Sequence, residues 1–268
     1  MPTTRSWLYV PGDREGWVAK AQRSGADVVI ADLEDAVALA DKDAAVGVVV
    51  TALQAEQDGA VPVWVRVDPD RLQDLTLVVA AGAAGIVLPK CGAALVAEVD
   101  ELLAGCARQV PLVPLVESAQ GLAELDEVAA LPRVLRFGMG EADLCADLGL
   151  LPGPDRTELA PYRAQVVAAS ARRGKTAPIG STSTELKDLD SVRATTQTLL
   201  RQGFRARTAV HPAQVAVVNE VLTPTEDDVR RAREVLAAQA GASDVGGRLV
   251  DEAVARSARE VLARAGGA

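Results

Sequence analysis

The sequence predicts a (β/α)8 barrel, a closed ring of eight parallel strands surrounded by helices. Short β-branched runs alternate with longer amphipathic stretches rich in Ala, Leu, Glu, Arg and Gln along most of the chain. The strand candidates are apolar on both faces, which is typical of a parallel sheet covered by helices. Eight β-then-α units in about 220 residues fit a closed barrel better than an open doubly wound sheet.

The first expected strand, "SWLYV", ends in a turn at Pro11-Gly12, and the second, "DVVIAD", is an unbroken apolar run that ends in carboxylates. The "VPGDREG" segment after the first strand lacks the glycine fingerprint of a Rossmann fold. The eight expected strands are 6–10, 27–32, 62–67, 85–89, 110–117, 134–139, 176–181 and 207–211. The expected helices lie near 14–24, 41–57, 70–81, 92–107, 120–130, 158–174, 188–202 and 212–221.

The C-terminal residues depart from this alternation. Residues 223–242 begin with a Thr/Pro cap signal and an acidic first turn, and we expect them to form an amphipathic helix. A second helix, "DEAVARSAREVLARA", is expected after the Gly/Ser/Asp-rich "GASDVGG". We therefore divide the chain into a catalytic barrel domain, residues 1–222, and a C-terminal helical lid or extension, residues 223–268.

Composition excludes several classes of partner. The 268-residue chain has a net charge of −9 and no dense run of Lys and Arg, which argues against nucleic acid. No stretch is apolar for the 18 or so residues that a membrane span needs, and the N-terminal apolar run is too short for a signal peptide. Three cysteines without metal spacing indicate free thiols in a reducing cytosol, so we expect a cytoplasmic protein.

Polar side chains follow nearly every expected strand, at the end of the barrel where active sites form. They are Asp32, Glu34, Asp35, Arg66, Asp68, Lys90, Glu117, Ser118, Glu141, Asp143, Ser181, Thr182 and His211. Carboxylates that meet at one mouth either share protons or bind a cation, and an oxygen-only set favours Mg²⁺ or Mn²⁺ over Zn²⁺.

Glu117 and Asp143 follow adjacent strands and could be the two metal ligands, with the carboxylates after the second strand facing the ion. The alternative is that these acids cap the helices that follow their strands. Arg66 is either a fork that holds a substrate carboxylate or the salt-bridge partner of the same acids. His211 is the only histidine, and we expect it to be a hydrogen-bonded scaffold residue. No G-x-S-x-G elbow surrounds Ser118 or Ser181, which argues against nucleophilic hydrolysis by a serine.

Several segments together resemble a known family. They are "RSWLYVPGDREGWVAKA", "ADVVIADLEDAV", "VLPK", "PLVESAQGL", "ADLCADLG", "AVHPAQVAVVNEVLTPTEDDVRRAREVL" and "GGRLVDEAV". They are similar to the citrate lyase β-subunit-like family of the HpcH/HpaI aldolase/citrate lyase superfamily, which includes malyl-CoA and citramalyl-CoA lyases. The resemblance spreads over nearly the whole chain and implies a magnesium-dependent carbon–carbon lyase on a (β/α)8 barrel.

The family pattern assigns roles to the residues at the mouth. By this resemblance Glu117 and Asp143 look like the metal ligands, and Arg66 looks like the residue that grips the acid substrate. Glu34 and Asp35 fall where the family holds water on the metal.

The resemblance also implies partners. Arg14 and Lys20 fall where related lyases meet the phosphates of coenzyme A, and Asp251 falls in a segment similar to the family's C-terminal lid. In the family this Asp reaches into a neighbouring subunit as an acid/base group, which implies a homo-oligomer, a trimer or hexamer, with the tail over a neighbour.

Three departures from the family pattern concern substrate identity. Asp68 stands where the family usually has Asn, and Ala142 stands where Glu usually precedes the metal Asp. In "IGSTSTELKD" at 179–188, Gly180 and Thr182 or its neighbours replace an Asp and a Tyr.

The sequence therefore predicts a lyase that cleaves or forms a 3-hydroxyacyl-CoA-type thioester of a dicarboxylic acid, malyl-, citramalyl- or citryl-CoA-like, through an enolate. Two alternatives stay open. One is a metal-dependent aldolase that acts on a free 4-hydroxy-2-oxo acid, and the other is a non-catalytic or carrier-dependent citrate lyase β-like subunit.

Overall fold

The strands of the computed structural model, which describes residues 4–55, 60–241 and 251–266, form a closed parallel barrel in the order β1 to β8. This confirms the predicted (β/α)8 fold class. The strands are β1 Ser6–Pro11, β2 Val28–Asp32, β3 Val63–Arg66, β4 Gly85–Leu88, β5 Leu112–Val116, β6 Gly138–Met139, β7 Ile179–Gly180 and β8 Ala206–Ala209. All five residues of β2 are buried, as expected for a strand with the lumen on one face and helices on the other.

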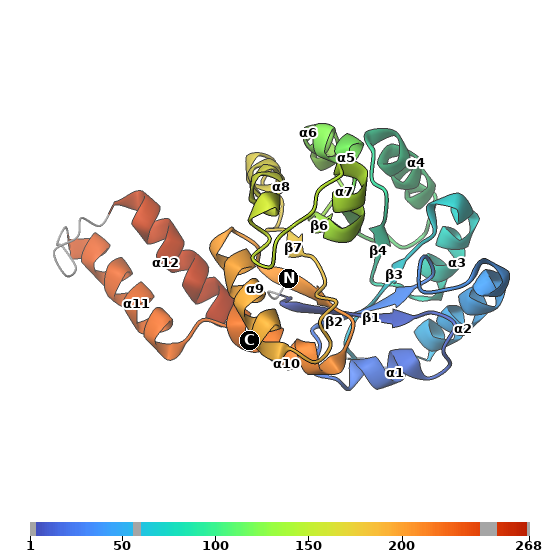
Figure 1. Ribbon diagram of the computed structural model, residues 1–268, viewed down its shortest axis with the longest axis horizontal. Helices are drawn as coiled ribbons and strands as arrows, with labels where there is room; N and C mark the ends of the chain where they lie inside the picture. The colour runs from blue at the N-terminus through green and yellow to red at the C-terminus, as the bar shows by residue number, and fades with distance from the viewer. Residues whose placement is uncertain (1–3, 56–59, 242–250, 267–268) are drawn as a thin grey trace.

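Helices α1 to α10 surround the ring (Figure 1), and amphipathic helices in such a position turn their apolar face toward the strands. In α4, for example, Val96, Val99 and Leu103 are buried at helical spacing. The helices are α1 Trp17–Gln22, α2 Lys42–Gln54, α3 Gln73–Ala81, α4 Ala93–Ala104, α5 Ala119–Ala123, α6 Leu125–Ala130, α7 Glu141–Leu148, α8 Ala160–Arg172, α9 Leu189–Arg201, α10 Pro212–Leu222, α11 Glu226–Gly241 and α12 Glu252–Ala265. Three 3-10 turns, η1 Leu39–Asp41, η2 Pro69–Arg71 and η3 Thr157–Leu159, lie in the loops.

Two strands are much shorter than the sequence predicts. The expected strand at 134–139 pairs at Val134 only as an isolated bridge and becomes β6 at Gly138–Met139. The expected strand at 176–181 contains Pro178, which has no N–H to donate, and β7 begins at Ile179. The buried Arg136 guanidinium donates a hydrogen bond from Nε to the Ala177 carbonyl at 2.7 Å. A side chain therefore replaces part of the hydrogen bonding between strands here.

The lumen below the mouth is filled by two tryptophans. Trp7 on β1 and Trp64 on β3 pack edge to face with ring centroids 4.9 Å apart, and both are buried. Gly85 on β4 makes room for them, because a Cβ there would lie 2.4 Å from the Trp64 ring. Each tryptophan precedes a residue of the mouth by two positions, Tyr9 and Arg66, so the aromatic pair forms the layer beneath the open end.

The C-terminal helices α11 and α12 form a hairpin that projects from one side of the barrel (Figure 1). The two helices pack on each other through small side chains, with Ala232, Ala238, Ala255 and Ala258 buried. Contact with the barrel comes near the C-terminus, where Arg264 donates to the Leu222 carbonyl at 3.5 Å. No helix in the described ranges, this hairpin included, is long and apolar enough to cross a membrane.

We expect Gly85→Ala to destabilise the protein by about 1–3 kcal/mol, because the added methyl group overlaps the Trp64 ring in a filled lumen. Gly47→Ala is the matched control. Gly47 lies in the middle of α2 with open space around its Cα, so the same methyl group should raise stability there by roughly 0.5–1 kcal/mol. Urea denaturation of both variants measures the difference, and equal effects of the two substitutions would contradict this account of the lumen.

Candidate functional site

An ion pair between adjacent strands lies at the C-terminal mouth of the barrel. The register of β2 and β3 places Asp32 opposite Arg66. The guanidinium forms two parallel hydrogen bonds to the Asp32 carboxylate, from Nε to Oδ1 at 2.7 Å and from Nη2 to Oδ2 at 2.5 Å. Asp32 is 2% exposed, so this fork joins two charges that are largely removed from water.

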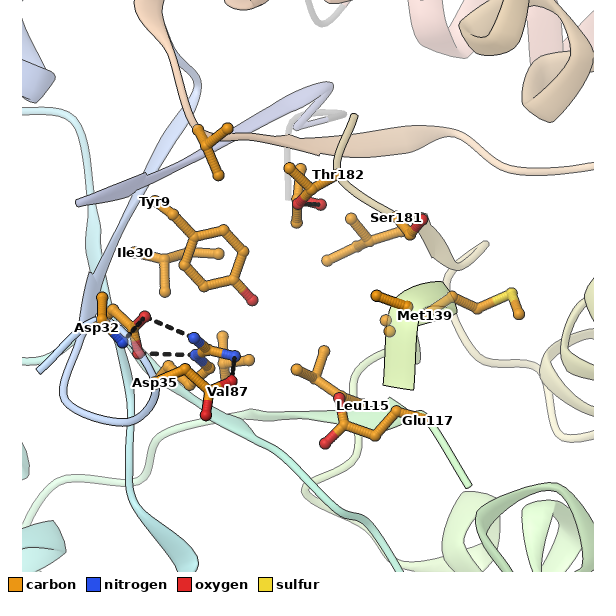
Figure 2. A pocket seen from close by; sticks show the side chains of 18 of the residues that line it. Tyr9, Ile30, Asp32, Asp35, Val87, Leu115, Glu117, Met139, Ser181 and Thr182 are labelled. Atoms are coloured by element: carbon orange, nitrogen blue, oxygen red, sulfur yellow. Dashed lines mark hydrogen bonds and ion pairs between the residues drawn. The ribbon is translucent and has the colours of Figure 1, made fainter. Parts of the chain in front are cut away.

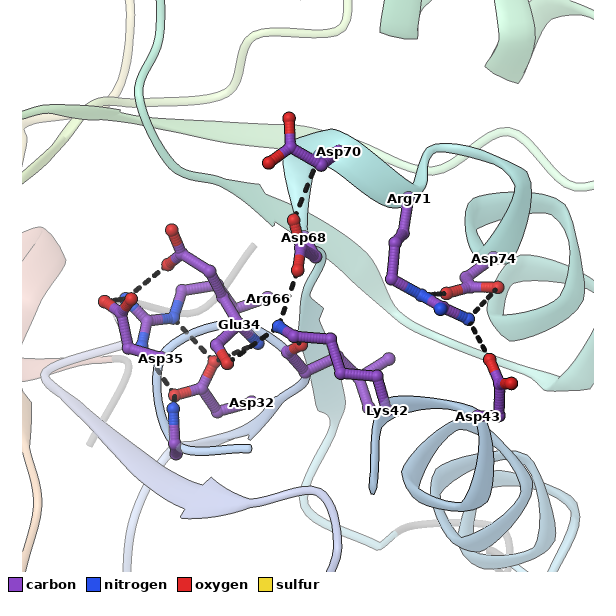
Figure 3. A network of polar contacts seen from close by, with 12 residues as sticks. Asp32, Glu34, Asp35, Lys42, Asp43, Arg66, Asp68, Asp70, Arg71 and Asp74 are labelled. Atoms are coloured by element: carbon purple, nitrogen blue, oxygen red, sulfur yellow. Dashed lines mark hydrogen bonds and ion pairs between the residues drawn. The ribbon is translucent and has the colours of Figure 1, made fainter. Parts of the chain in front are cut away.

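The same guanidinium also contacts the other carboxylates after β2 (Figure 3). Its Nη1 lies 2.9 Å from Glu34 Oε2 and 3.4 Å from Asp35 Oδ2. Burial raises the pKa of Glu34, and Arg66 opposes that rise. Burial alone would lower the pKa of Arg66, but its hydrogen bonds to Asp32 raise it above the ordinary value, so the guanidinium stays charged. Of the two predicted roles for Arg66, the structure shows the salt bridge. The N–H groups of its guanidinium point toward three acids of its own chain.

Lys42 holds the loop that presents these acids. Its Nζ is buried and donates to the carbonyls of Leu33 at 2.9 Å and Glu34 at 3.0 Å, and it lies 2.5 Å from Asp68 Oδ2. Burial tends to raise the pKa of Asp68, but the hydrogen bond from Lys42 lowers it below the usual range. The acid that departs from the family pattern thus has a cationic partner inside the chain. Sequence reasoning missed Lys42, although a lysine at the start of an expected helix, near several acids, was a usable signal.

Glu117 follows β5 and is the most deeply buried acid that has no cationic partner within salt-bridge distance among the described residues. Its Oε1 accepts the backbone N–H of Lys90 at 2.6 Å. Burial, aided by the charges of Glu34 and Asp143, raises the pKa of Glu117 to about 7. Gly140 allows the carboxylate its position, since a Cβ there would lie 2.4 Å from Glu117 Oε2.

Lys90 connects Glu117 to the acids after β2. Its backbone has a φ of 52°, an unusual value for a residue other than glycine, and this conformation directs its N–H to Glu117. Its ammonium group, which is mostly exposed, lies 3.4 Å from Glu34 Oε1. Lys90 therefore spans the two sides of the mouth.

Asp143 lies in the first turn of α7, a helix that the sequence interpretation missed. Two acids in its first turn and Gly149 after its last turn, with a φ of 65°, were usable signals. The neighbouring Glu141 forms an ion pair with the buried Arg163, whose Nε and Nη2 donate to its two carboxylate oxygens at 2.7 and 2.9 Å. Asp143 has no such partner among the described residues and remains exposed toward the cavity.

A cavity of about 520 Å³ opens at this mouth and brings the acids together. Arg66, Glu117 and Asp143 line its polar rim, and Figure 2 shows Asp32 and Asp35 on one side and Glu117 across from them. Branched apolar side chains form its deeper wall, namely Ile30, Val87, Val113, Leu115 and Ile179. Within the described ranges no three His, Cys, Asp or Glu side chains cluster to hold a metal ion, so a metal here would rely on two carboxylates.

The two residues expected at coenzyme A phosphates lie outside this cavity. Arg14 is exposed beside Asp13, at 3.4 Å, and the Lys20 ammonium lies 5.8 Å from the centre of the Trp17 ring. Trp17 itself lines the cavity and is 47% exposed. Lys20 therefore lies near an aromatic side chain at the edge of the opening, and Arg14 is three residues before that side chain in the sequence.

Asp251 lies at the N-terminus of α12, at the end of the hairpin that points away from the barrel (Figure 1). Its Oδ1 accepts the Val254 N–H at 2.9 Å, so within one chain it caps α12 and does not reach the mouth. Residues 246–250 of the expected lid segment fall outside the described residues. His211 caps α10 through Nδ1, which accepts the Ala213 N–H at 3.1 Å, and this confirms its predicted scaffold role.

Residues 5–212 match the family model of HpcH/HpaI aldolase/citrate lyase. The chain belongs to this family. Among curated relatives, the citrate lyase subunit beta of Leuconostoc mesenteroides subsp. cremoris is 31% identical over 278 residues, covering 96% of this chain and 92% of the relative. A (3S)-malyl-CoA thioesterase of Cereibacter sphaeroides is 32% identical over 272 residues, covering 97% and 94%.

Solved structures of family members share the fold. Protein CitE from Mycobacterium tuberculosis, in complex with magnesium, acetoacetate and coenzyme A, is 28% identical and matches with a TM-score of 0.81, covering 98% of both chains. Family membership confirms the predicted resemblance and the assignment of the chain to carbon–carbon lyases. The finer predictions, on substrate and on the roles of single residues, belong to the proposal below.

Glu117→Gln should stabilise the metal-free protein at pH 8 and have little effect near pH 4.5. In the folded state Glu117 keeps a proton up to a pKa of about 7, whereas its ordinary value is 4.5, so wild-type stability falls as the pH rises through this interval. The neutral amide avoids this loss, worth up to about 3 kcal/mol above pH 7, and still accepts the Lys90 N–H.

The midpoint of urea denaturation, measured at both pH values without divalent ions, checks this prediction. Glu98→Gln on the outer face of α4 serves as the control, because this side chain is exposed. A gain in stability that is the same at both pH values would show that Glu117 is already ionised at low pH in the folded protein.

Proposed function

We propose that the protein is a Mg²⁺-dependent carbon–carbon lyase that cleaves, or forms, a malyl-, citramalyl- or citryl-CoA-like thioester. The observation that carries this proposal is the meeting of Glu117 and Asp143 at one cavity of a chain from the citrate lyase family. The magnesium and coenzyme A in the related CitE complex support the choice of ion and thioester.

The donor set at the mouth fits a hard divalent cation. Glu117 is a buried carboxylate whose ordinary charge is suppressed by burial and by neighbouring acids, so a cation beside it would restore that charge. Asp143 would supply the second protein ligand from α7. A bound Mg²⁺ would stabilise the negative charge that develops on a carbonyl oxygen when the carbon–carbon bond breaks to give an enolate.

The chain's own groups would keep this site in order. Arg66 holds Asp32, Glu34 and Asp35 in fixed positions at the wall where an acid substrate would bind, and in this proposal it grips that acid together with other donors of the cavity. In this proposal Glu34 and Asp35 orient water around the ion site. The apolar deeper wall excludes bulk water from the reacting carbons.

The thioester would enter from the rim. Arg14 and Lys20, which lie three residues before and after the exposed Trp17 in the sequence, would meet the phosphates of coenzyme A. Asp251 is too remote within one chain, so its proposed acid/base role at the enolate carbon requires the hairpin of a neighbouring copy, in a trimer or hexamer. The projecting hairpin supports this arrangement, because it leaves α11 and α12 largely free of their own barrel.

Turnover of malyl-, citramalyl- and citryl-CoA with and without Mg²⁺ tests the proposed function, and we expect one of them to give a 2-oxo acid and an acyl-CoA only when Mg²⁺ is present. Both products are measured, since a thioesterase is among the relatives. Release of free coenzyme A from the intact hydroxyacid would show a thioesterase instead. Cleavage restricted to free 4-hydroxy-2-oxo acids, or no cleavage without added proteins, would favour the aldolase or the carrier-dependent subunit.

Asp143→Asn should reduce turnover to the level that wild type shows without Mg²⁺ and weaken Mn²⁺ binding by about 10²-fold or more, the scale on which metal-site contacts act. Asp147→Asn is the matched control, because Asp147 lies one turn further along α7 and accepts the Ala119 N–H outside the cavity. Calorimetric titration with Mn²⁺ and steady-state assays of both variants check the prediction. Unchanged metal affinity in Asp143→Asn would remove this residue from the ligand set.

A further inference from the structure

Tyr9 presents an unpaired hydroxyl to the cavity. Its side chain extends from β1, directly above the layer of Trp7, and its hydroxyl points toward the middle of the cavity in Figure 2. Among the described residues this hydroxyl has no hydrogen-bond partner. Tyr9 is half-buried, and its hydroxyl faces the open cavity instead of the packed core. A molecule that enters the cavity can therefore accept a hydrogen bond from it.

The aromatic ring of Tyr9 is held rigidly. The Arg66 guanidinium lies over its face, 5.1 Å from the ring centre, and Arg66 is itself fixed by the fork to Asp32. The hydroxyl is thus placed by two strands, β1 through the ring and β3 through the guanidinium. A donor that is fixed in this way costs little entropy when it binds a ligand.

The hydroxyl remains a donor at neutral pH. Burial raises the pKa of Tyr9; the nearby Arg66 lowers it in part, and the charges of Asp32, Glu117 and Glu34 raise it further. The other hydroxyls of this wall are partly engaged, since Thr182 and Thr208 hydrogen-bond to each other at 2.7 Å. A neutral donor suits a pocket whose rim already carries several acids.

Arg66 alone is a weak receptor for a substrate anion. Its Nε and Nη2 are engaged by Asp32, and its Nη1 faces Glu34 and Asp35. A small acid bound beside it would find a guanidinium whose charge is already balanced. The Tyr9 hydroxyl, next to Arg66 and across from Glu117, is a neutral donor that such an anion can reach (Figure 2).

We propose that Tyr9 is a substrate-contacting residue whose hydroxyl donates a hydrogen bond to the carboxylate of the 2-oxo acid part of the substrate. The proposal rests on the proposed lyase function. It assigns recognition of the small acid to β1 as well as to the mouth of β3. The substrate retains this contact in both directions of the reaction, because the carboxylate is not a reacting group.

Tyr9→Phe tests the contact, because it removes only the hydroxyl and keeps the ring against Arg66. In the presence of Mg²⁺ we expect the dissociation constants of pyruvate and glyoxylate to rise about 10- to 100-fold, as for a lost hydrogen bond to a charged acceptor. The KM of the thioester substrate should rise with them, while Mn²⁺ affinity stays as in wild type. Tyr162→Phe on α8, the other tyrosine of the chain, is the control and should change none of these values.

A spectroscopic readout complements the binding data. The full-length protein labelled with 3-fluorotyrosine contains two ¹⁹F sites, and the Tyr162→Phe variant assigns the Tyr9 resonance. Pyruvate with Mg²⁺ should shift the Tyr9 resonance and leave that of Tyr162 in place. Circular dichroism and the thermal midpoint verify that both variants are folded.

The outcomes separate this proposal from the one it rests on. If wild type binds the acids and cleaves a thioester, but Tyr9→Phe binds them equally well, the Tyr9 contact is refuted and the lyase function stands. A variant that loses only kcat with unchanged acid binding refutes the contact as well. If wild type neither binds these acids nor cleaves any of the thioesters, the lyase function itself fails.

Discussion

The ion pair between Arg66 and Asp32 is the interaction on which the mouth of the barrel depends. Burying a carboxylate and a guanidinium costs several kcal/mol for each ion, and mutual attraction offsets this only with good geometry. The register of β2 and β3 supplies that geometry, since it sets the two residues directly opposite each other. From this fixed point Arg66 also contacts Glu34, Asp35 and the face of Tyr9, so one side chain ties together three parts of the rim.

Glu117 presents the opposite case. It is nearly as buried as Asp32 and Glu34, but among the described residues its carboxylate accepts from a backbone N–H and has no cationic partner. That N–H belongs to Lys90, whose left-handed backbone costs of the order of 1–3 kcal/mol in a residue other than glycine. The contact between Glu117 and Lys90 therefore lowers the stability of the fold in two ways, through a buried carboxylate without a cationic partner and through an unfavourable backbone conformation. Such a loss is typical of a position that is optimised for a ligand and not for the empty fold.

The sequence was sufficient for the architecture and for the end of the barrel at which the candidate side chains gather. The alternation of apolar strands and amphipathic helices predicted all eight strands, because burial on both faces leaves a clear pattern in β2, β3, β4 and β5. The pattern of apolar residues did not predict the lengths of β6 and β7 or the presence of α7. In β6 and β7 the Arg136 side chain and Pro178 interrupt the ladder, and α7 is too short, with too few core-facing residues, to show a helical period.

Within the site, residue types at strand ends identified Arg66, Glu117 and the acids after β2 as neighbours. Sequence could not say which acid Arg66 holds, because that follows from strand register and side-chain direction. It also missed Tyr9 and Lys42. An aromatic residue inside a strand is indistinguishable from core until the lumen is seen to be open above Trp7, and a lysine at a helix start resembles any exposed lysine until it is found buried.

The tryptophan pair in the lumen has a kinetic consequence. Trp7 and Trp64 fill the lumen beneath the cavity, which opens at the C-terminal end of the barrel. Whatever reaches the deep wall beside Ile30 and Val113 must arrive before any larger molecule covers that opening, and must depart after it. Under the proposed function, the small acid would therefore be the first ligand to enter and the last to leave.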